Sequence, residues 1–183
     1  MMQTPVNNTY TDDRAVATAL RGVIVRGERN RLTETAAAGI DGARAALETF
    51  YHAFNTRSVD LAQRIWADDP LVQLVSPVAG LLRGSADIAA AYARGFSGSL
   101  QVQTVLEDIV AYVTPELVVF TGRERGTYTP DSEHEAMSEL PAIRSICIFR
   151  FIAEQGGWRQ VYHHVSLDDA DQLARYQRAV RGA

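Results

Sequence analysis

The stretch Gly156-Gly157-Trp158-Arg159-Gln160-Val161-Tyr162-His163-His164-Val165-Ser166 is the clearest indication of the fold of this chain. Its two adjacent glycines indicate a tight turn, and the aromatic and β-branched residues after them predict a strand over 158–166. Neighbouring side chains on a strand face opposite sides of the sheet, so only one of the two histidines can enter a given interior. The stretch therefore predicts a final strand that directs a single histidine inward.

The preceding sequence extends this strand into a sheet. Apolar residues change from a helical spacing to a period of two after residue 99, which predicts further strands over 100–113, 116–128 and 143–152. Short turns such as Thr114-Pro115 connect them, so an antiparallel meander is expected. In 143–152 both faces carry apolar residues, and a strand of that kind needs cover on both sides.

The first half of the chain is mainly helical in its patterning. Asp41 can cap a helix whose apolar positions recur at three and four residues up to Phe54. A second short helix is predicted over 60–66, a strand over 71–75, and a third helix from Gly84-Ser85 to Phe96. Helices followed by a meander are typical of an α+β domain.

The length and charge limit the possible classes of protein. With 183 residues, 46% of them hydrophobic, the chain is sufficient for one domain with a substantial core. A formal net charge of −4 argues against nucleic-acid binding, and no apolar run has the length of a membrane span. Cys147 is the single cysteine and no secretion signal is visible, so we expect a cytoplasmic protein.

Three segments are expected along the chain. Residues 1–40 form an N-terminal extension with a short helix beginning at Asp12, residues 41–168 form the domain, and residues 169–183 form a helical tail. A long acidic loop over 130–141 separates two strands of the meander. Its Glu133-His134-Glu135 run does not have the spacing of a metal site, and we expect no metal and no cofactor.

The order of these motifs resembles the nuclear transport factor 2-like superfamily, which includes SnoaL-like domains and ketosteroid isomerases. The resemblance covers residues 41–168 and rests on the Phe54-Asn55 helix end, Trp66-Ala67-Asp68-Asp69, the helix beginning Gly84-x-x-x-Ile88, and the meander. The last strand is also similar to that of the calcium/calmodulin-dependent kinase association domain. The resemblance implies a cystatin-like cone in which a curved antiparallel sheet wraps around three helices, encloses a pocket and forms a homodimer.

Ketosteroid isomerase chemistry is not expected. It requires a carboxylate base and two hydrogen-bond donors, a tyrosine and a protonated aspartic acid. The resemblance carries these three roles onto Ser76 or Leu74, Phe50 and Cys147, none of which can perform them. Tyr92 matches a tyrosine that supports the oxyanion network.

His163 is the remaining candidate for acid–base chemistry. If Cys147 faces the cavity, alternation places Val161, His163 and Val165 inward, and Tyr162 and His164 on the convex face. An imidazole can exchange a proton near neutral pH, or it can be satisfied by a neighbouring hydroxyl or carbonyl in a structural role. A Cys147–His163 nucleophile is disfavoured because apolar surroundings raise the pKa of a thiol.

Two functions remain open. The first is a pocket that binds a small apolar or aromatic molecule. Such a pocket could also support proton transfer, as in a cyclase, dehydratase or isomerase-like reaction. Its catalytic candidate is His163 and its expected wall is made by Phe50, Phe54, Trp66, Ser76, Tyr92, Cys147, Phe149 and Val161. The second is a non-catalytic module that dimerises through its sheet face or senses a ligand. In both cases the partners expected are a small molecule and a second copy, not nucleic acid or membrane.

Overall fold

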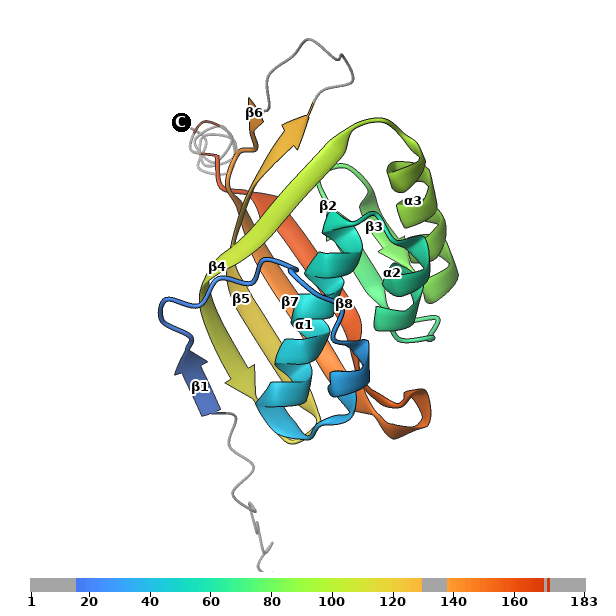
Figure 1. Cartoon of the computed structure of the whole chain (residues 1–183), viewed down its shortest axis with the longest axis vertical. Helices are drawn as coiled ribbons and strands as arrows, with labels where there is room; N and C mark the ends of the chain where they lie inside the picture. Colours follow the sequence, from blue (N-terminus) through green and yellow to red (C-terminus); the bar gives the residue numbers. More distant parts are fainter. Residues whose placement is uncertain (1–15, 130–137, 170, 172–183) are drawn as a thin grey trace, which may run out of the picture.

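A computed structural model describes residues 16–129, 138–169 and 171. They form one curved sheet with three α-helices against one of its faces (Figure 1). The helices are α1 (Gly39–Asn55), α2 (Val59–Ile65) and α3 (Ser85–Ser97), and two 3-10 turns lie at Leu32–Ala36 and Ala153–Gln155. The strands are β1 (Val16–Ala19), β2 (Gln73–Ser76), β3 (Gly80–Arg83), β4 (Gln101–Val113), β5 (Leu117–Thr129), β6 (Ser138–Glu139), β7 (Ile143–Ile152) and β8 (Gly157–Leu167).

The sheet has the order β1-β4-β5-β7-β8-β2-β3, with β6 paired to β5. Every pair is antiparallel except β2 with β8, which is parallel, so the sheet is mixed where a purely antiparallel one was expected. The parallel pair arises because the chain enters β2 from α2 and returns to this edge only after the complete meander. The expected α+β cone around three helices is confirmed.

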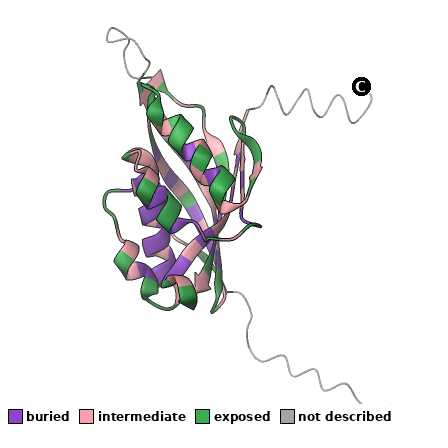
Figure 2. Ribbon diagram, turned by 90° about the vertical axis from the view of Figure 1, so that its right-hand side faces the viewer, coloured by how far each residue is buried: buried purple, intermediate pink, exposed green. Residues whose placement is uncertain are grey.

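The core lies between α1 and the concave face of the sheet. Helix α1 crosses that face, and the buried residues concentrate between the two layers (Figure 2). Its apolar stripe packs there, with Leu47, Phe50 and Tyr51 all at most 3% exposed. At the end of α1, the Asn55 side chain donates to the carbonyls of Arg26 and Thr104 and accepts from the Thr104 amide. These bonds fasten the helix terminus to β4.

The strands show the predicted alternation. On β7, Ser145, Cys147 and Phe149 are buried while Arg144 and Arg150 are exposed. Such a pattern indicates one face against the helices and one face outward. The predicted strands over 100–113, 116–128, 143–152 and 158–166 correspond to β4, β5, β7 and β8 within two residues at each end.

The N-terminal segment differs from the expectation. From Val16 the chain forms strand β1 on the edge of β4, where a helix beginning at Asp12 was predicted. The edge of β4 has unpaired backbone N–H and C=O groups, and these bond to residues 16–19. This pairing outweighs the weak helical pattern of the local sequence. The segment then lies across the domain, since Val25 bridges Leu106 and belongs to the core.

Two other expectations fall largely beyond the described residues. The predicted helical tail over 169–183 is described only at residues 169 and 171, and most of the acidic loop lies in 130–137. Among the described helices, none combines the length and apolar character needed to cross a membrane.

Candidate functional site

Three adjacent strands place polar side chains on the concave face of the sheet. Cys147 of β7 is paired with His163 of β8, and Glu124 lies on the same face of β5, four residues beyond Phe120, the partner of Cys147. All three side chains are buried, at 0%, 6% and 6% exposure respectively. The inward direction that alternation predicted for Cys147 and His163 is therefore present.

Glu124 and His163 form a buried ion pair. The His163 Nε2 atom lies 3.2 Å from Glu124 Oε1, and the Tyr51 hydroxyl of α1 donates to the same oxygen at 2.7 Å. Ser145 Oγ lies 3.2 Å from His163 Nε2 and 3.8 Å from Cys147 Sγ. We call these five residues (Tyr51, Glu124, Ser145, Cys147 and His163) the polar cluster.

The electrostatics of the cluster favour a charged pair. Burial opposes ionisation of Glu124, but the hydrogen bond and charge of His163, with the bond from Tyr51, outweigh it and hold the pKa of Glu124 below its ordinary value. Burial likewise opposes protonation of His163, yet the adjacent sulfur of Cys147 and the Glu124 carboxylate raise the pKa of this imidazole. Both shifts therefore favour a carboxylate beside an imidazolium.

The second ring nitrogen of His163, Nδ1, does not take part in this ion pair or in a hydrogen bond with the described residues. Nδ1 is buried and has no hydrogen-bond partner among the described residues. Phe50 packs against the ring edge-on, with centroids 4.9 Å apart. A protonated ring thus carries one N–H toward Glu124 and one N–H that is available as a donor.

The expected wall residues separate into two groups. Phe50, Trp66, Tyr92, Cys147 and Phe149 are buried in the core around the polar cluster. The half-buried ones are Phe54, Ser76 and Val161, of which Phe54 and Val161 pack against the core. Ser76 does not act as an interior polar point, because its hydroxyl accepts from the Ala79 amide in the β2–β3 turn.

Three members of the cluster, Tyr51, Glu124 and Ser145, were not predicted from the sequence. On β5, Glu124 alternates with Arg123 and Arg125. The arginines are indeed exposed, but Glu124 is in phase with the buried Val118 and Phe120 on the same strand. An acidic residue in phase with an apolar row is the signal that could have identified it.

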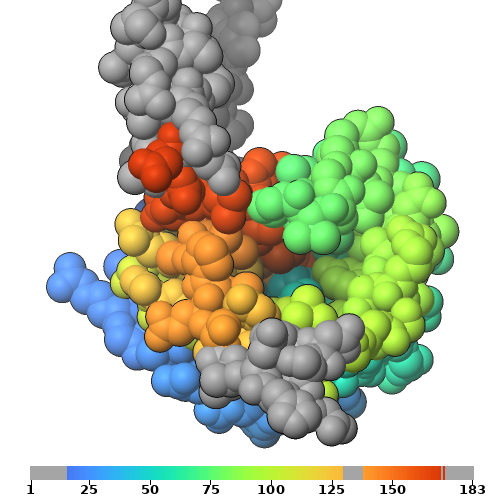
Figure 3. All heavy atoms as spheres, turned by 90° about the horizontal axis from the view of Figure 1, so that it is seen from above, coloured from blue at the N-terminus to red at the C-terminus, as the bar shows by residue number. Residues whose placement is uncertain are grey.

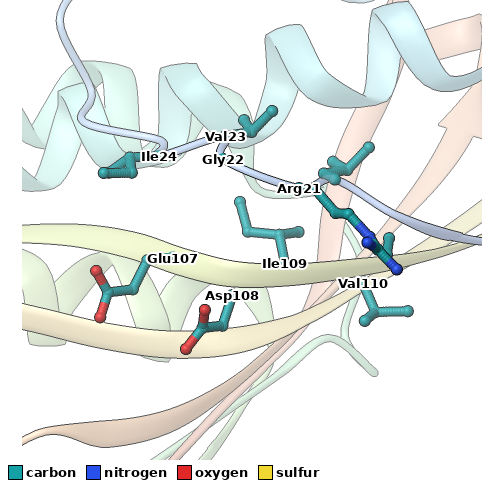
Figure 4. A pocket seen from close by; sticks show the side chains of 10 residues that line it. Arg21, Gly22, Val23, Ile24, Glu107, Asp108, Ile109 and Val110 are labelled. Carbon is teal, nitrogen blue, oxygen red and sulfur yellow. The ribbon is translucent and has the colours of Figure 1, made fainter.

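An enclosed pocket beside His163 was expected from the sequence. Two grooves are present on the surface, and both lie away from His163. One, of about 420 Å³, is formed where the segment after β1 passes over a bulge in β4 between Glu107 and Val110 (Figure 4). The other, of about 500 Å³, lies near Arg26, Asn55 and Arg125. Neither is lined by His163 or by any of the predicted wall residues.

The surface has a further hollow at one end of the cone (Figure 3). In Figure 3 the surface is hollowed between α3 and the β2–β3 hairpin on one side and β7 and β8 on the other. Ser145 and Val165 are paired near the start of β7 and the end of β8. Within 16–129, 138–169 and 171, no three His, Cys, Asp or Glu side chains are placed to hold a metal ion together.

Comparison with known proteins agrees with this architecture. The family model of the SnoaL-like domain matches residues 43–169. The chain belongs to the SnoaL-like domain family. No curated protein sequence matches this SnoaL-like chain significantly.

Several solved structures are similar to this SnoaL-like protein. A candidate calcium/calmodulin-dependent protein kinase type II association domain from Thiobacillus denitrificans has 28% identity and a TM-score of 0.55, over 69% of this chain and 94% of that one. A candidate dehydratase of the NTF2-like family from Streptomyces avermitilis has 21% identity and a TM-score of 0.62, over 72% and 97%. A ketosteroid isomerase-like protein from Erwinia carotovora atroseptica has 17% identity and a TM-score of 0.56, over 69% and 93%.

Proposed function

We propose that this SnoaL-like protein binds a small, mostly apolar molecule inside the cone and transfers a proton to it from His163. The observation that carries the proposal is the buried Nδ1 of His163, which has no partner in the described part of the chain while Nε2 is held by Glu124. A buried donor without a partner is costly in a purely structural site. Its presence beside the ring of Phe50 is what a ligand site would require.

The proposed role of each residue follows from its contacts. Glu124 holds the ring through Nε2 and stabilises its positive charge, while Tyr51 keeps the carboxylate in place. The proton at Nδ1 passes to an oxygen of the bound molecule, and the imidazolium becomes a neutral imidazole with its Nε2–H still directed at Glu124. A later proton from the ligand or from water restores the imidazolium. His163 is the catalytic residue in this proposal, and Glu124 and Tyr51 are positioning residues.

The raised pKa of His163 favours a role as acid over a role as base. Protonation of a leaving hydroxyl or polarisation of a carbonyl fits this role, and a dehydratase or isomerase-like reaction would use either. The similarity to the candidate dehydratase of Streptomyces avermitilis is in keeping with this class.

Purification of the protein from its own cells tests the proposal. Native mass spectrometry should show a retained small molecule, and incubation of that molecule with the protein in D₂O should introduce deuterium at a carbon next to the carbonyl that His163 polarises, a position that exchanges slowly without an enzyme. His163→Gln should abolish the exchange, while His164→Gln, on the convex face, should retain it. Because His163→Gln leaves Glu124 without its cation, the double variant His163→Gln/Glu124→Gln serves as a second, charge-balanced test. Undiminished exchange by both variants, or the lack of any retained molecule, would contradict the proposal.

A second role, as a dimerisation module, is favoured by the convex face of the sheet. Tyr112, Val119, Ile148 and Tyr162 follow one another across four strands in register, and Val110, Thr121, Ile146 and His164 form the next row. Tyr112 is 44% exposed and Ile146 is 36% exposed, so apolar surface faces outward at the centre of the sheet. We propose that a second copy covers these two rows. The similarity to the candidate kinase association domain supports this role.

A further inference from the structure

Trp66 and Gln160 bring unpartnered polar atoms to one place in the interior. Trp66 is 3% exposed and Gln160 is 0% exposed. The indole Nε1 and both amide atoms of Gln160 have no hydrogen-bond partner among the described residues. Buried polar side chains are normally paired, so three such atoms together call for a physical reason.

The backbone holds these two side chains next to each other. Trp66 and Gln160 form a parallel bridge, and the amide of Ala67 donates to the carbonyl of Gln160 at 2.9 Å. Paired residues of neighbouring strands project to the same side, so both side chains are directed into the core. Tyr92 of α3 is near the indole: burial raises the pKa of its hydroxyl, and a weak hydrogen-bonding influence of the Trp66 side chain partly offsets that rise, although no contact of Nε1 with the described residues has the geometry of a hydrogen bond.

A bulge in β8 brings Gln160 next to His163 along the inward face of the strand. Tyr162 pairs with Ile148 whereas Gln160 pairs with Phe149, so Val161 is an additional residue in β8. Gln160 and His163 consequently occupy successive inward positions although they are three residues apart. The unpartnered Nδ1 of His163 lies on this inward face as well.

We propose that Trp66 and Gln160 bind an uncharged hydroxyl group of the same molecule to which His163 transfers a proton. The proposal rests on the proposed function in that a small molecule must enter the cone. The indole donates only, while the amide both donates and accepts, so a hydroxyl that accepts one bond and donates another satisfies the pair.

A charged group does not fit this subsite. Among the described residues, the buried charged side chains are Glu124 and His163, and they already neutralise each other. A carboxylate bound at Trp66 and Gln160 would have no buried cation to balance it. The ligand class is therefore a neutral alcohol, enol or phenol on an apolar frame.

Phenol, toluene and benzoate are the probes for this subsite. The chain contains two tryptophans, so a nitrogen–proton correlation spectrum has two indole signals. Phenol at millimolar concentration should shift the Trp66 indole signal, whereas toluene should bind without that shift and benzoate should not bind. The Trp158 indole, which already donates to the Ala37 carbonyl, is the internal control and should stay in place. Trp66→Phe assigns the two signals.

Gln160→Leu removes the amide and keeps a similar volume. The ratio of phenol affinity to toluene affinity should fall about tenfold in this variant, the effect of losing one or two hydrogen bonds. The ligand-free variant should melt at the same temperature as the wild type or higher, because it no longer buries an unpartnered amide. A clearly lower melting temperature would show that the amide is structural and would overturn the proposal.

Other results also decide between the two proposals. Failure of phenol to bind, or phenol binding without a shift of the Trp66 indole signal, overturns the hydroxyl subsite. If toluene binds and Gln160→Leu leaves the ratio of phenol affinity to toluene affinity unchanged, the hydroxyl subsite is refuted and the apolar ligand site is supported. If the preference for phenol over toluene depends on Gln160 but the His163 variants retain deuterium exchange, the hydroxyl subsite is supported and the proton-transfer role of His163 is refuted.

Discussion

The Glu124–His163 pair is the most consequential residue-level feature of the interior. A buried ion pair is stabilising only when further hydrogen bonds compensate for lost hydration. Here Tyr51 donates to the carboxylate, and Ser145 lies within hydrogen-bond distance of the imidazole. Nδ1 of His163 is the part of the pair left uncompensated, and it is the atom that the proposed chemistry uses.

The pair predicts how stability depends on pH. His163 has a pKa above its ordinary 6.5, so its stabilisation is complete below pH 6.5 and is lost as pH rises through the folded-state pKa. Glu124 has a pKa below its ordinary 4.5, so its stabilisation is complete above pH 4.5 and is lost as pH falls through the folded-state pKa. The free energy of unfolding contributed by the pair should therefore be greatest between these two values and decline on the alkaline side.

Urea titrations across this pH range check the prediction. The double variant His163→Gln/Glu124→Gln should lose the alkaline decline, because neither amide titrates. His164→Gln should keep it, since His164 lies on the convex face and contacts Tyr162. An identical pH profile for the double variant and the wild type would mean that the buried pair does not control stability.

At the scale of elements, strand β8 depends on the turn that starts it. Gly157 has φ +129°, which side-chain-bearing residues rarely adopt, and a Cβ atom there would lie 2.3 Å from the Thr35 carbonyl oxygen. The close approach allows the 3-10 turn Leu32–Ala36 to pack on β8. Gly157 is therefore a packing requirement as well as a turn residue.

Gly157→Ala should lower the free energy of unfolding by about 1–3 kcal/mol through backbone strain, and by more where the Thr35 contact must open. Gly95→Ala is the matched control, because Gly95 lies exposed within α3 with open space around its Cα. That change should raise stability by up to about 1 kcal/mol. Chemical denaturation of both variants measures the difference, and equal stabilities would refute the role assigned to Gly157.

The bulge at Val161 shows where alternation alone fails. Strict alternation places Gln160 on the convex face with Tyr162 and His164, yet Gln160 is fully buried. The additional residue changes the phase of β8 at that point, so Trp158 and Gln160 face inward before the bulge and His163 after it. A bulge of this kind is set by pairing with β7, which no local pattern reveals.

At the scale of the whole molecule, the convex face predicts self-association. Ile146→Asp places a charge in the centre of the two apolar rows and should shift a dimer toward the monomer by about 1–3 kcal/mol. Val78→Asp is the control, because Val78 is 99% exposed in the β2–β3 turn, away from the rows. Analytical ultracentrifugation measures both. A monomeric wild type at micromolar concentration would argue directly against the dimer.

The three α-helices, the four long strands, the α+β class and the inward direction of Cys147 and His163 could all be predicted from the sequence. These follow from periodicity and from short turns, which are local properties of the chain. The parallel β2–β8 pair, strand β1, and the burial of Tyr51, Glu124 and Gln160 in one interior appear only in the folded structure. These features depend on contacts between residues that are far apart in the sequence, as in the Tyr51–Glu124 hydrogen bond at a separation of 73 residues. A local pattern of apolar and polar residues does not specify which distant strand edges and faces pair.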